Sequence, residues 1–482
     1  MPDTVHLSKW LIYFLVLLYF GIVIAAVVVV LRENRNPIRA LSWVIALIFL
    51  PGVGLIFYLF FGRSLRGEMM TQQNRRRMMK RKRTPTPHFT DSGLPDDGRH
   101  LMSLGRRLGG FSFTTGNKIE IFTDGKIKFE QLKADLRKAK KSILLQYYIF
   151  LDDSTGQEIA DILMEKAKEG LEVKVIYDHV GSFRARNSFF KKMETAGVRT
   201  QPFFRVNFPQ FANRINWRNH RKIVVIDGET GYIGGMNIAD RYVGKDKKKE
   251  GNVWRDTHFR VKGDIVESLV YSFAIDWNFR KKESYIPNII NPEEQHREEG
   301  NSGIQLVTGG PVSKWNNLSL MFLKAISSAK KTIWIQTPYF LPTDALFNAL
   351  MAAALSDVDV RIMMPRLTDS TLLHYASFSY ITQCLETGIK VYLYEPGMLH
   401  AKGMIIDDNL VTAGSTNFDF RSFENNFESN LFIYDKEFNR RMRDIFYEDL
   451  EKCIRVKKET WSRRPLTHRF LESLLRLVSP IL

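Results

Sequence analysis

The sequence predicts an α/β protein made of two copies of one unit and preceded by apolar N-terminal segments. Three observations support this prediction. Val/Ile-rich runs alternate with helical stretches beyond Pro87, a spaced set of polar residues occurs twice, and the first 62 residues contain two long uncharged runs. A chain of 482 residues is long enough for more than one domain. Its only cysteines, Cys384 and Cys453, argue against a disulfide scaffold.

The two uncharged runs predict two transmembrane helices. Residues 10–31 carry no charge, and at about 1.5 Å per residue they are long enough to cross a hydrocarbon layer of roughly 30 Å. Their length and the lack of a small-residue cleavage pattern argue against a signal peptide. Residues 40–62 form the second run. It contains the stretch Pro51-Gly-Val-Gly54, so we expect it either to be kinked or to enter the membrane and return.

Positive charge is concentrated next to these runs. The chain has 70 Lys and Arg against 52 Asp and Glu, and nine basic residues and one acid lie between Arg63 and Arg83. The positive-inside rule therefore predicts that the part after the second run is cytoplasmic. The same basic segment is suited to anionic lipid headgroups, or it is a solvated linker that only fixes topology; both can hold.

A repeat is visible beyond the basic segment. Residues 139–150 ("AKKSILLQYYIF") resemble residues 329–340 ("AKKTIWIQTPYF"), and in each case a helix-to-strand pattern follows. A second correspondence has an offset of 180 positions. It pairs His220, Lys222, Asp227, Gly234, Asn237 and Arg241 with His400, Lys402, Asp407, Gly414, Asn417 and Arg421. Residues 283–303 are the predicted linker between the two copies.

The repeated residues suggest a phosphate site. Side chains alternate along a strand, so His220 and Lys222 share a face, whereas Asp227 points away and is expected to make structural hydrogen bonds. The same parity holds for His400, Lys402 and Asp407. Gly234, Gly235, Gly414 and Ser415 are expected to let the backbone approach an anionic group, and Asn237 and Asn417 to donate to it.

Two histidines suit a two-step substitution at phosphorus. One attacks and forms a phosphohistidine, while the other protonates the departing oxygen and later deprotonates the incoming hydroxyl. Metal catalysis is disfavoured, because no His-x-x-x-His helix or carboxylate cluster accompanies the motifs and a lysine beside each histidine would repel a divalent ion. Asp256 and Glu428 either orient the histidines or are surface or capping acids. Their unequal offsets from His220 and His400 fit a lysine-rich insertion near residue 247.

The paired motifs resemble the HKD motifs of the phospholipase D superfamily. Together with the N-terminal apolar runs and the stretches "WRDTHFRVKG" and "QTPYFLP", they resemble bacterial cardiolipin synthases. The resemblance implies two tandem phospholipase D-like domains, each a mixed sheet flanked by helices, with the active site at their interface. It also implies catalysis without a metal or other cofactor. Two phosphatidylglycerol molecules would give cardiolipin and glycerol, with His220 as the nucleophile and His400 as the acid and base.

The domain organisation follows from these features. We expect a membrane anchor (1–62), a basic linker (63–115), two phospholipase D-like domains (116–300 and 301–455) and an amphipathic tail (456–482). The tail is either an interfacial helix or an ordinary helix packed on the domain. The expected location is the bacterial plasma membrane, multi-pass, with the catalytic domains on the cytoplasmic side. The expected partners are phosphatidylglycerol and anionic lipids, with no nucleic acid.

Three other functions remain open from the sequence. A hydrolytic phospholipase D, or a phosphatidyltransferase with another acceptor, would use the same residues and differ only in whether water reaches the intermediate. A tethered phosphodiesterase acting on nucleic acid fits the net charge of +18, although no nucleic-acid motif is present. A non-catalytic membrane scaffold would not need either histidine.

Overall fold

The computed structural model describes most of the chain and divides it into two compact units. One unit comprises residues 1–68 and 206–216, and the other comprises residues 69–205 and 217–482. The described residues are 3–32, 37–50, 52–58, 96–109, 111–206, 216–245, 253–279, 285 and 299–478. The predicted basic cluster at 63–83 lies outside them, as does most of the predicted linker at 283–303.

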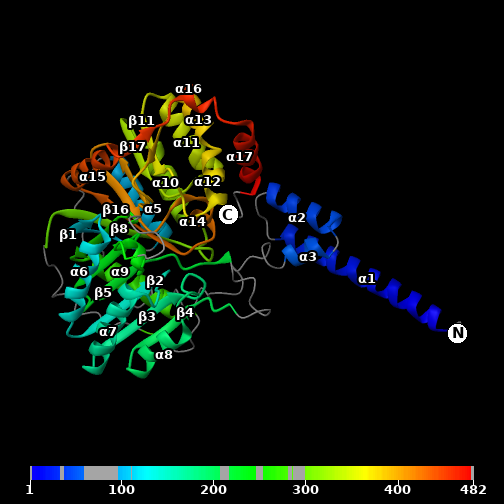
Figure 1. Ribbon diagram of the computed structural model, residues 1–482, viewed down its shortest axis with the longest axis horizontal. Helices are drawn as coiled ribbons and strands as arrows, with labels where there is room; N and C mark the ends of the chain where they lie inside the picture. Colours follow the sequence, from blue (N-terminus) through cyan, green and yellow to red (C-terminus); the bar gives the residue numbers. More distant parts are fainter. Residues whose placement is uncertain are drawn as a thin grey trace. The chain divides into compact units, whose positions relative to one another are not determined.

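The described part of the N-terminal unit contains the helices α1 (Asp3–Arg32), α2 (Pro37–Phe49) and α3 (Val53–Phe57) (Figure 1). Within the described residues, one helical segment, Lys9–Leu31, is long and apolar enough to cross a membrane. The second apolar run does not continue as one helix. It breaks at Gly52, which has a φ of 74°, and α3 packs on α2 so closely that a Cβ at Gly54 would lie 2.2 Å from the Ala46 carbonyl oxygen.

The second unit is a large α/β body. Fifteen of its described strands form one hydrogen-bonded sheet, in the order β17-β12-β11-β9-β13-β14-β16-β8-β1-β7-β6-β5-β2-β3-β4. The first half supplies β1 (Phe113–Phe122), β2 (Ser142–Tyr147), β3 (Glu172–Asp178), β4 (Arg199–Phe203), β5 (Ile223–Ile226), β6 (Thr230–Gly234) and β7 (His258–Lys262). The second half supplies β8 (Ser302–Gly309), β9 (Thr332–Gln336), β11 (Asp359–Pro365), β12 (Lys390–Tyr394), β13 (Gly403–Ile406), β14 (Leu410–Gly414), β16 (Glu428–Tyr434) and β17 (Cys453–Arg455). β10 (Phe340–Leu341) and β15 (Phe418–Asp419) form a separate parallel pair.

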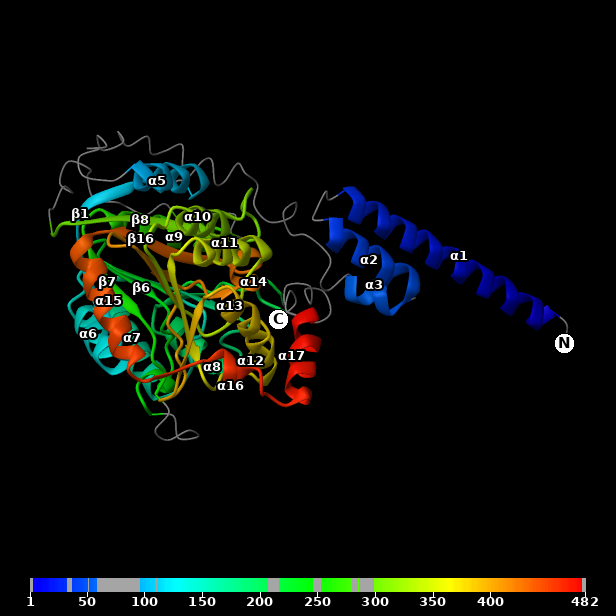
Figure 2. The same ribbon diagram turned by 90° about the horizontal axis from the view of Figure 1, so that it is seen from above.

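Helices cover these strands in both halves (Figures 1 and 2). The first half contains α5 (Asp96–Gly109), α6 (Gly125–Arg137), α7 (Ser154–Lys168), α8 (Asn187–Thr195) and α9 (Ile265–Trp277). The second half contains α10 (Asn317–Ser327), α11 (Asp344–Leu355), α12 (Thr371–Phe378), α13 (Ile381–Glu386), α14 (Phe420–Glu424), α15 (Lys436–Leu450), α16 (Lys458–Trp461) and α17 (Leu466–Val478). Asp124, Asp153 and Asp435 cap α6, α7 and α15 through backbone N–H groups.

One shared core joins the halves. β1 pairs with β8 through residues 113–117, with a register shift between Thr114 and Asn117, and with β7 through residues 118–122. A buried cluster contains strand residues of both halves, including Ile223 and Val411, together with apolar side chains of α9 and α15. The halves are therefore a structural repeat within one compact unit.

The sheet register places the two motifs at equivalent edges. In each half, parallel strands are followed by an antiparallel hairpin, and the first hairpin strand pairs with the first parallel strand. Gln146 at the end of β2 lies opposite Ile223, and Gln336 at the end of β9 lies opposite Gly403. His220 and His400, just before those hairpin strands, therefore lie at the carboxyl ends of the parallel strands, the usual position of functional groups in α/β sheets.

Candidate active site

The His220 segment is held by a buried ion pair and by the opposite half of the chain. Asp178, at the end of β3, accepts hydrogen bonds from the Arg218 guanidinium at 3.0 Å and from the Asn219 backbone N–H at 2.8 Å. The His220 backbone N–H donates to the carbonyl oxygen of Phe427 at 2.9 Å, and the Phe427 N–H donates to Arg218 at 2.8 Å. Backbone pairing between the halves thus fixes the histidine from the first motif.

The His400 segment has the mirrored arrangement. Its backbone N–H donates to the carbonyl oxygen of Arg255 at 2.7 Å, and the Arg255 N–H donates to Met398 at 3.0 Å. The Arg255 guanidinium lies 2.6 Å from Asp449 of α15. Each histidine is therefore attached to a strand that belongs to the other copy of the repeat.

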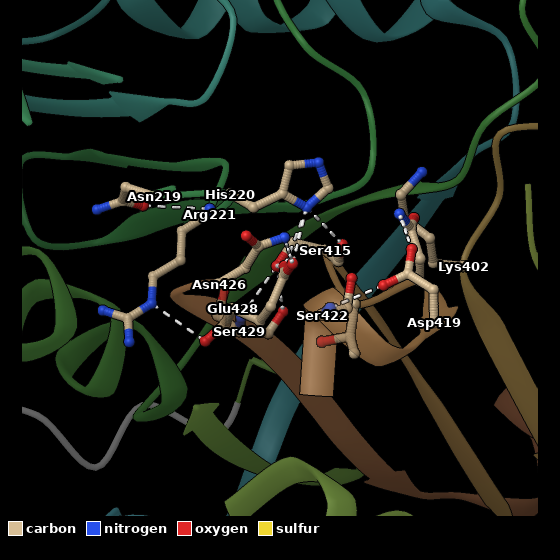
Figure 3. Close-up of polar contacts among 12 residues, drawn as sticks. Asn219, His220, Arg221, Lys402, Ser415, Asp419, Ser422, Asn426, Glu428 and Ser429 are labelled. Atoms are coloured by element: carbon tan, nitrogen blue, oxygen red, sulfur yellow. Dashed lines mark hydrogen bonds and ion pairs between the residues drawn. The ribbon is translucent and has the colours of Figure 1, made fainter. Parts of the chain in front are cut away.

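The acids that orient the histidines are also exchanged between the halves. His220 Nδ1 lies 3.0 Å from Glu428 Oε1 (Figure 3). His400 Nδ1 lies 2.6 Å from Asp256 Oδ2. Asp256 and Glu428 occupy equivalent positions in the two halves. The last residue of β6 pairs with His258, two residues after Asp256, and the last residue of β14 pairs with Asn430, two residues after Glu428. Both acids are fully buried, so the alternative of a surface or capping acid is wrong. An Nδ1–H donated to a carboxylate leaves Nε2 of each ring as the reactive nitrogen.

Both motif lysines are buried beside the histidines. Lys222 is 0% exposed and donates to the His220 carbonyl oxygen at 2.5 Å. Lys402 is 2% exposed; its Nζ lies 2.7 Å from His400 Nδ1 and 3.5 Å from Asp256 Oδ2. Two ammonium groups and two carboxylates therefore surround the two imidazoles in a low-dielectric environment.

This environment keeps both imidazoles uncharged at neutral pH. Burial lowers the pKa of His220, and Lys222 lowers it further, against the opposing effect of Glu428. Burial and then Lys402 lower the pKa of His400 to about 3, although Asp256 acts in the opposite direction. Burial also lowers the pKa of both lysines.

The carboxylates remain ionised despite their burial. Burial alone would raise the pKa of Asp256, but the charge of Lys402 and the hydrogen bond with His400 outweigh it, and the net pKa is lowered. Burial opposes ionisation of Glu428 in the same way, and His220 and Lys222 together lower its pKa. Each histidine therefore faces a carboxylate charge that can stabilise a positively charged ring.

The small residues of the motifs pack closely against neighbouring segments. A Cβ at Gly235 would lie 2.1 Å from Asp256 Oδ1, and a Cβ at Gly234 would lie 2.5 Å from the Cα of His258. A Cβ at Gly414 would lie 2.2 Å from the Ser429 carbonyl oxygen. Ser415 donates its hydroxyl to Glu428 Oε2 at 2.5 Å. The absence of a side chain at the glycines makes room for the segments that carry Asp256 and Glu428, and approach of the backbone at these positions to a ligand stays a prediction.

The motif asparagines make contacts within the protein. Asn237 donates to the Tyr242 hydroxyl at 3.0 Å and accepts from the Ile149 N–H at 3.2 Å. Asn417 donates to Asp419 Oδ2 at 2.9 Å. Since a carboxamide has two N–H groups, contact of either asparagine with a phosphate stays a prediction.

The motif aspartates do not join the histidines. Asp227 accepts hydrogen bonds from three successive backbone N–H groups, those of Lys140, Lys141 and Ser142, at 2.7–2.9 Å. Asp407 does the same for residues 330–332. Both follow the far ends of β5 and β13 and have positive φ values of 55° and 47°. These are the structural hydrogen bonds that strand parity predicts, and they connect a turn to the start of a neighbouring strand.

Sequence reasoning missed the aromatic residues around the rings. Tyr148 packs edge-on against His220 with centroids 4.8 Å apart, and Trp254 lies 4.9 Å from His400. The Tyr242 hydroxyl lies 3.3 Å from His400 Nδ1. Tyr148 lies within the repeated stretch 139–150, Tyr242 directly follows Arg241, and Trp254 lies two residues before Asp256. Aromatic residues in or near the stretches already singled out were therefore the available signal. Among the described residues, no group of three or more His, Cys, Asp or Glu side chains is arranged to hold a metal.

A polar network that the sequence did not predict surrounds the His220 segment. Arg221 makes a bidentate ion pair with Asp276 of α9, with both distances 2.7 Å, and donates to the Glu428 carbonyl oxygen at 3.1 Å. Gln146 and Asn219 also donate to Asp276. This network fixes the His220 segment relative to the strand that carries Glu428 (Figure 3).

Comparison with known families agrees with this geometry. The model of the family "Cardiolipin synthase, PLD-like domain" matches residues 132–277 and 322–450, one match in each half. A second family model, "Phospholipase_D-nuclease N-terminal", matches residues 21–63. The duplication and the apolar N-terminal region are thus both features of known families.

Similar proteins cover almost the whole chain. The major cardiolipin synthase of Bacillus subtilis is 38% identical over 469 residues, which covers 95% of this chain and 97% of that protein. A cardiolipin synthase of Listeria innocua is 39% identical over 485 residues, covering 98% and 99%. The crystal structure of a phosphatidylserine synthase from Haemophilus influenzae has the same fold, with a TM-score of 0.61, 17% identity, and coverage of 79% of this chain and 98% of that one. With its two matched halves and its full-length relatives, the chain belongs to the cardiolipin synthase family of phospholipase D-like proteins.

Proposed function

We propose that this protein is a cardiolipin synthase that transfers a phosphatidyl group between two phosphatidylglycerol molecules. The observation that carries the proposal is the exchange of orienting acids, in which His220 meets Glu428 and His400 meets Asp256. Because each histidine is positioned by the other half, the active site is assigned to the contact between the two halves. The names of the full-length relatives support the choice of substrate.

In the first step, Nε2 of His220 attacks the phosphorus of one phosphatidylglycerol. The bond between phosphorus and the glycerol headgroup oxygen breaks, and His400 supplies a proton to that oxygen, so glycerol leaves. In the second step, the headgroup hydroxyl of another phosphatidylglycerol gives its proton to His400. Its oxygen attacks phosphorus, the P–N bond breaks, and cardiolipin forms with both histidines regenerated.

The charges around the rings fit these roles. Lys222 and Lys402 supply positive charge for the phosphoryl oxygens as negative charge develops on them. A bound phosphodiester would partly neutralise Lys402, whose charge lowers the pKa of His400, so substrate binding raises that pKa and favours the proton-donating form. Glu428 stabilises the positively charged ring of phosphatidyl-His220.

The N-terminal unit is assigned to the membrane. Lys9–Leu31 is the first membrane segment, and the broken second run, α2 with α3, is the second. With both segments inserted, the catalytic body lies on the cytoplasmic face of a bacterial plasma membrane, the side that the distribution of basic residues favours.

The test is a product analysis with labelled phosphatidylglycerol. The purified full-length protein in phosphatidylglycerol vesicles is expected to release glycerol and form cardiolipin. Phosphatidic acid as the main product would show that the protein hydrolyses the lipid instead of transferring its phosphatidyl group. Salt-dependent DNA binding without any lipid product would favour the nucleic-acid alternative. His220→Ala is the inactive control, and Arg440→Ala, on the exposed side of α15, is the control for substitution itself.

A further inference from the structure

The C-terminal helix α17 lies close to the second motif. It packs on α12, which follows the carboxyl end of β11, the edge of the sheet where His400 is located (Figures 1 and 2). The Ser377 hydroxyl of α12 accepts a hydrogen bond from the Phe340 N–H of β10, and β10 pairs with β15, directly after Asn417. Only one helix and one short strand pair therefore separate α17 from the motif.

One side of α17 is fixed to the catalytic body. Glu472 is 5% exposed and accepts from Arg464 at 2.9 Å. Arg476 donates to Gln383 of α13 at 2.7 Å and lies over the ring of Tyr380, and Leu475 packs against the core. These contacts orient α17 and determine which of its faces is turned outward.

The outward face is apolar. Its large side chains remain in solvent in the isolated chain; they are Leu466 (76% exposed), Phe470 (68%), Leu471 (38%), Leu474 (48%) and Leu477 (78%). Leu367 and Leu372, at the start of the neighbouring α12 region, are 73% and 50% exposed. An unpartnered apolar surface of this kind on a folded protein marks an interaction site.

The basic residues around α17 indicate what kind of surface its apolar face contacts. Residues 457–476 contain six Lys and Arg and two Glu, and one of these acids, Glu472, is buried and paired. Exposed Arg463 and Arg469 flank the apolar residues on either side. Apolar residues bordered by cations match the boundary between acyl chains and anionic phosphate headgroups better than they match a second protein surface.

We propose that α17 inserts its outward face into the surface of an anionic phospholipid bilayer, next to the second motif, as a membrane contact separate from the N-terminal helices. The proposal rests on the proposed function in that it places the catalytic edge at the layer that holds phosphatidylglycerol headgroups. Contact at this edge shortens the path of a headgroup from the bilayer to the histidines.

The first experiment measures the environment of α17 without any turnover. Full-length protein carrying His220→Ala, Cys453→Ala and Leu474→Cys is labelled with an environment-sensitive dye, since the remaining Cys384 is buried. In phosphatidylglycerol nanodiscs we expect a blue-shifted emission and protection from aqueous iodide. A dye at Leu355→Cys is the matched control, because Leu355 is 69% exposed at the end of α11 and precedes β11, at the opposite edge of the sheet.

Three outcomes would overturn the docking proposal. The Leu474 dye could remain as accessible to iodide as the Leu355 dye, or phosphatidylcholine nanodiscs could shift it as strongly as anionic ones. Alternatively, it could be shielded in detergent in a concentration-dependent manner, which would identify the partner as a second copy of the chain. Because the protein carries His220→Ala, none of these results depends on whether the wild-type chain makes cardiolipin.

The second experiment measures turnover. The double variant Phe470→Glu/Leu474→Glu is expected to lower the initial rate at limiting phosphatidylglycerol by about tenfold, the factor that 1.4 kcal/mol represents. Saturating phosphatidylglycerol restores the rate, and Leu355→Glu behaves like wild type. An unchanged rate in the double variant at limiting substrate would refute docking and leave the proposed reaction intact, whereas absence of cardiolipin from wild-type protein would refute the reaction alone.

Discussion

Replacement of Glu428 by glutamine tests the exchange of acids between the halves. Glu428 is completely buried, and its carboxylate contacts His220 Nδ1 at 3.0 Å, the Ser415 hydroxyl at 2.5 Å and Asn426 Nδ2 at 3.2 Å. Glutamine keeps the shape and one acceptor oxygen but removes the negative charge. The change therefore acts on His220 across the contact between the halves and leaves the first motif itself unaltered.

The magnitude follows from the loss of the negative charge in the hydrogen bond between Glu428 and His220. A hydrogen bond to a charged group contributes about 1.5–3 kcal/mol, and about 1.4 kcal/mol corresponds to a factor of ten in rate. Glu428 stabilises the ring most when it is positively charged, as it is in the phosphatidyl-histidine intermediate. We therefore expect Glu428→Gln to lower kcat by about 10- to 150-fold.

The direction in which the pH profile shifts is a second test, independent of the size of the rate loss. Burial lowers the pKa of His220, whereas Glu428 raises it, so removal of the carboxylate lowers this pKa further. His220 must be unprotonated to attack, and activity is therefore lost as pH falls through its pKa. The acidic limb of kcat/KM should move to lower pH in Glu428→Gln, even though the plateau is reduced.

The assay is cardiolipin formation in phosphatidylglycerol vesicles between pH 4 and 9. Glu437→Gln, an exposed acid in the first turn of α15, serves as the matched control and should leave both rate and profile unchanged. A Glu428→Gln rate within about twofold of wild type, or an acidic limb displaced to higher pH, would refute the assigned role.

Three further outcomes are expected. Asp227→Ala should lower the free energy of unfolding by about 2–4 kcal/mol, because three backbone N–H groups lose their acceptor, while kcat per folded molecule stays close to wild type; denaturant titration and activity together check this. Gly235→Ala should displace Asp256 and reduce kcat by tenfold or more in the same vesicle assay, whereas Gly403→Ala, whose Cβ would have ordinary contacts of 3.6 Å or longer, should not. Lys222→Met should reduce kcat about 100-fold or more through loss of charge at the phosphoryl oxygens, and a chelator should leave the wild-type rate unchanged.

The repeat made much of this fold predictable. The 180-residue offset between the two motifs correctly indicated two equivalent α/β halves. This was possible because the succession of strands and helices along the chain follows from local sequence patterns. The strand parity of Asp227 also indicated its structural hydrogen bonds. Asp256 and Glu428 were recognised as candidates because they follow the motifs at comparable distances.

The pairing between halves was not predictable from spacing. Spacing within one copy suggests that Asp256 serves His220, but each acid belongs to the histidine of the other copy, since the contact depends on how the two halves pack. The close packing at Gly235 was not predictable for the same reason, because the group that approaches it is the Asp256 side chain, just before β7. The break at Gly52, by contrast, agrees with the kink or return that Pro51 and the neighbouring glycines predict for this apolar run.

The most direct test of the central claim is to map the covalent intermediate in single-histidine variants. With labelled phosphatidylglycerol, His400→Ala should accumulate one acid-labile phosphatidyl group per chain on His220, because the base that activates the second alcohol is missing. His220→Ala should accumulate none. Adducts on the remaining histidine in both variants would mean that the two histidines act at independent centres, which would contradict a single site shared by the two halves.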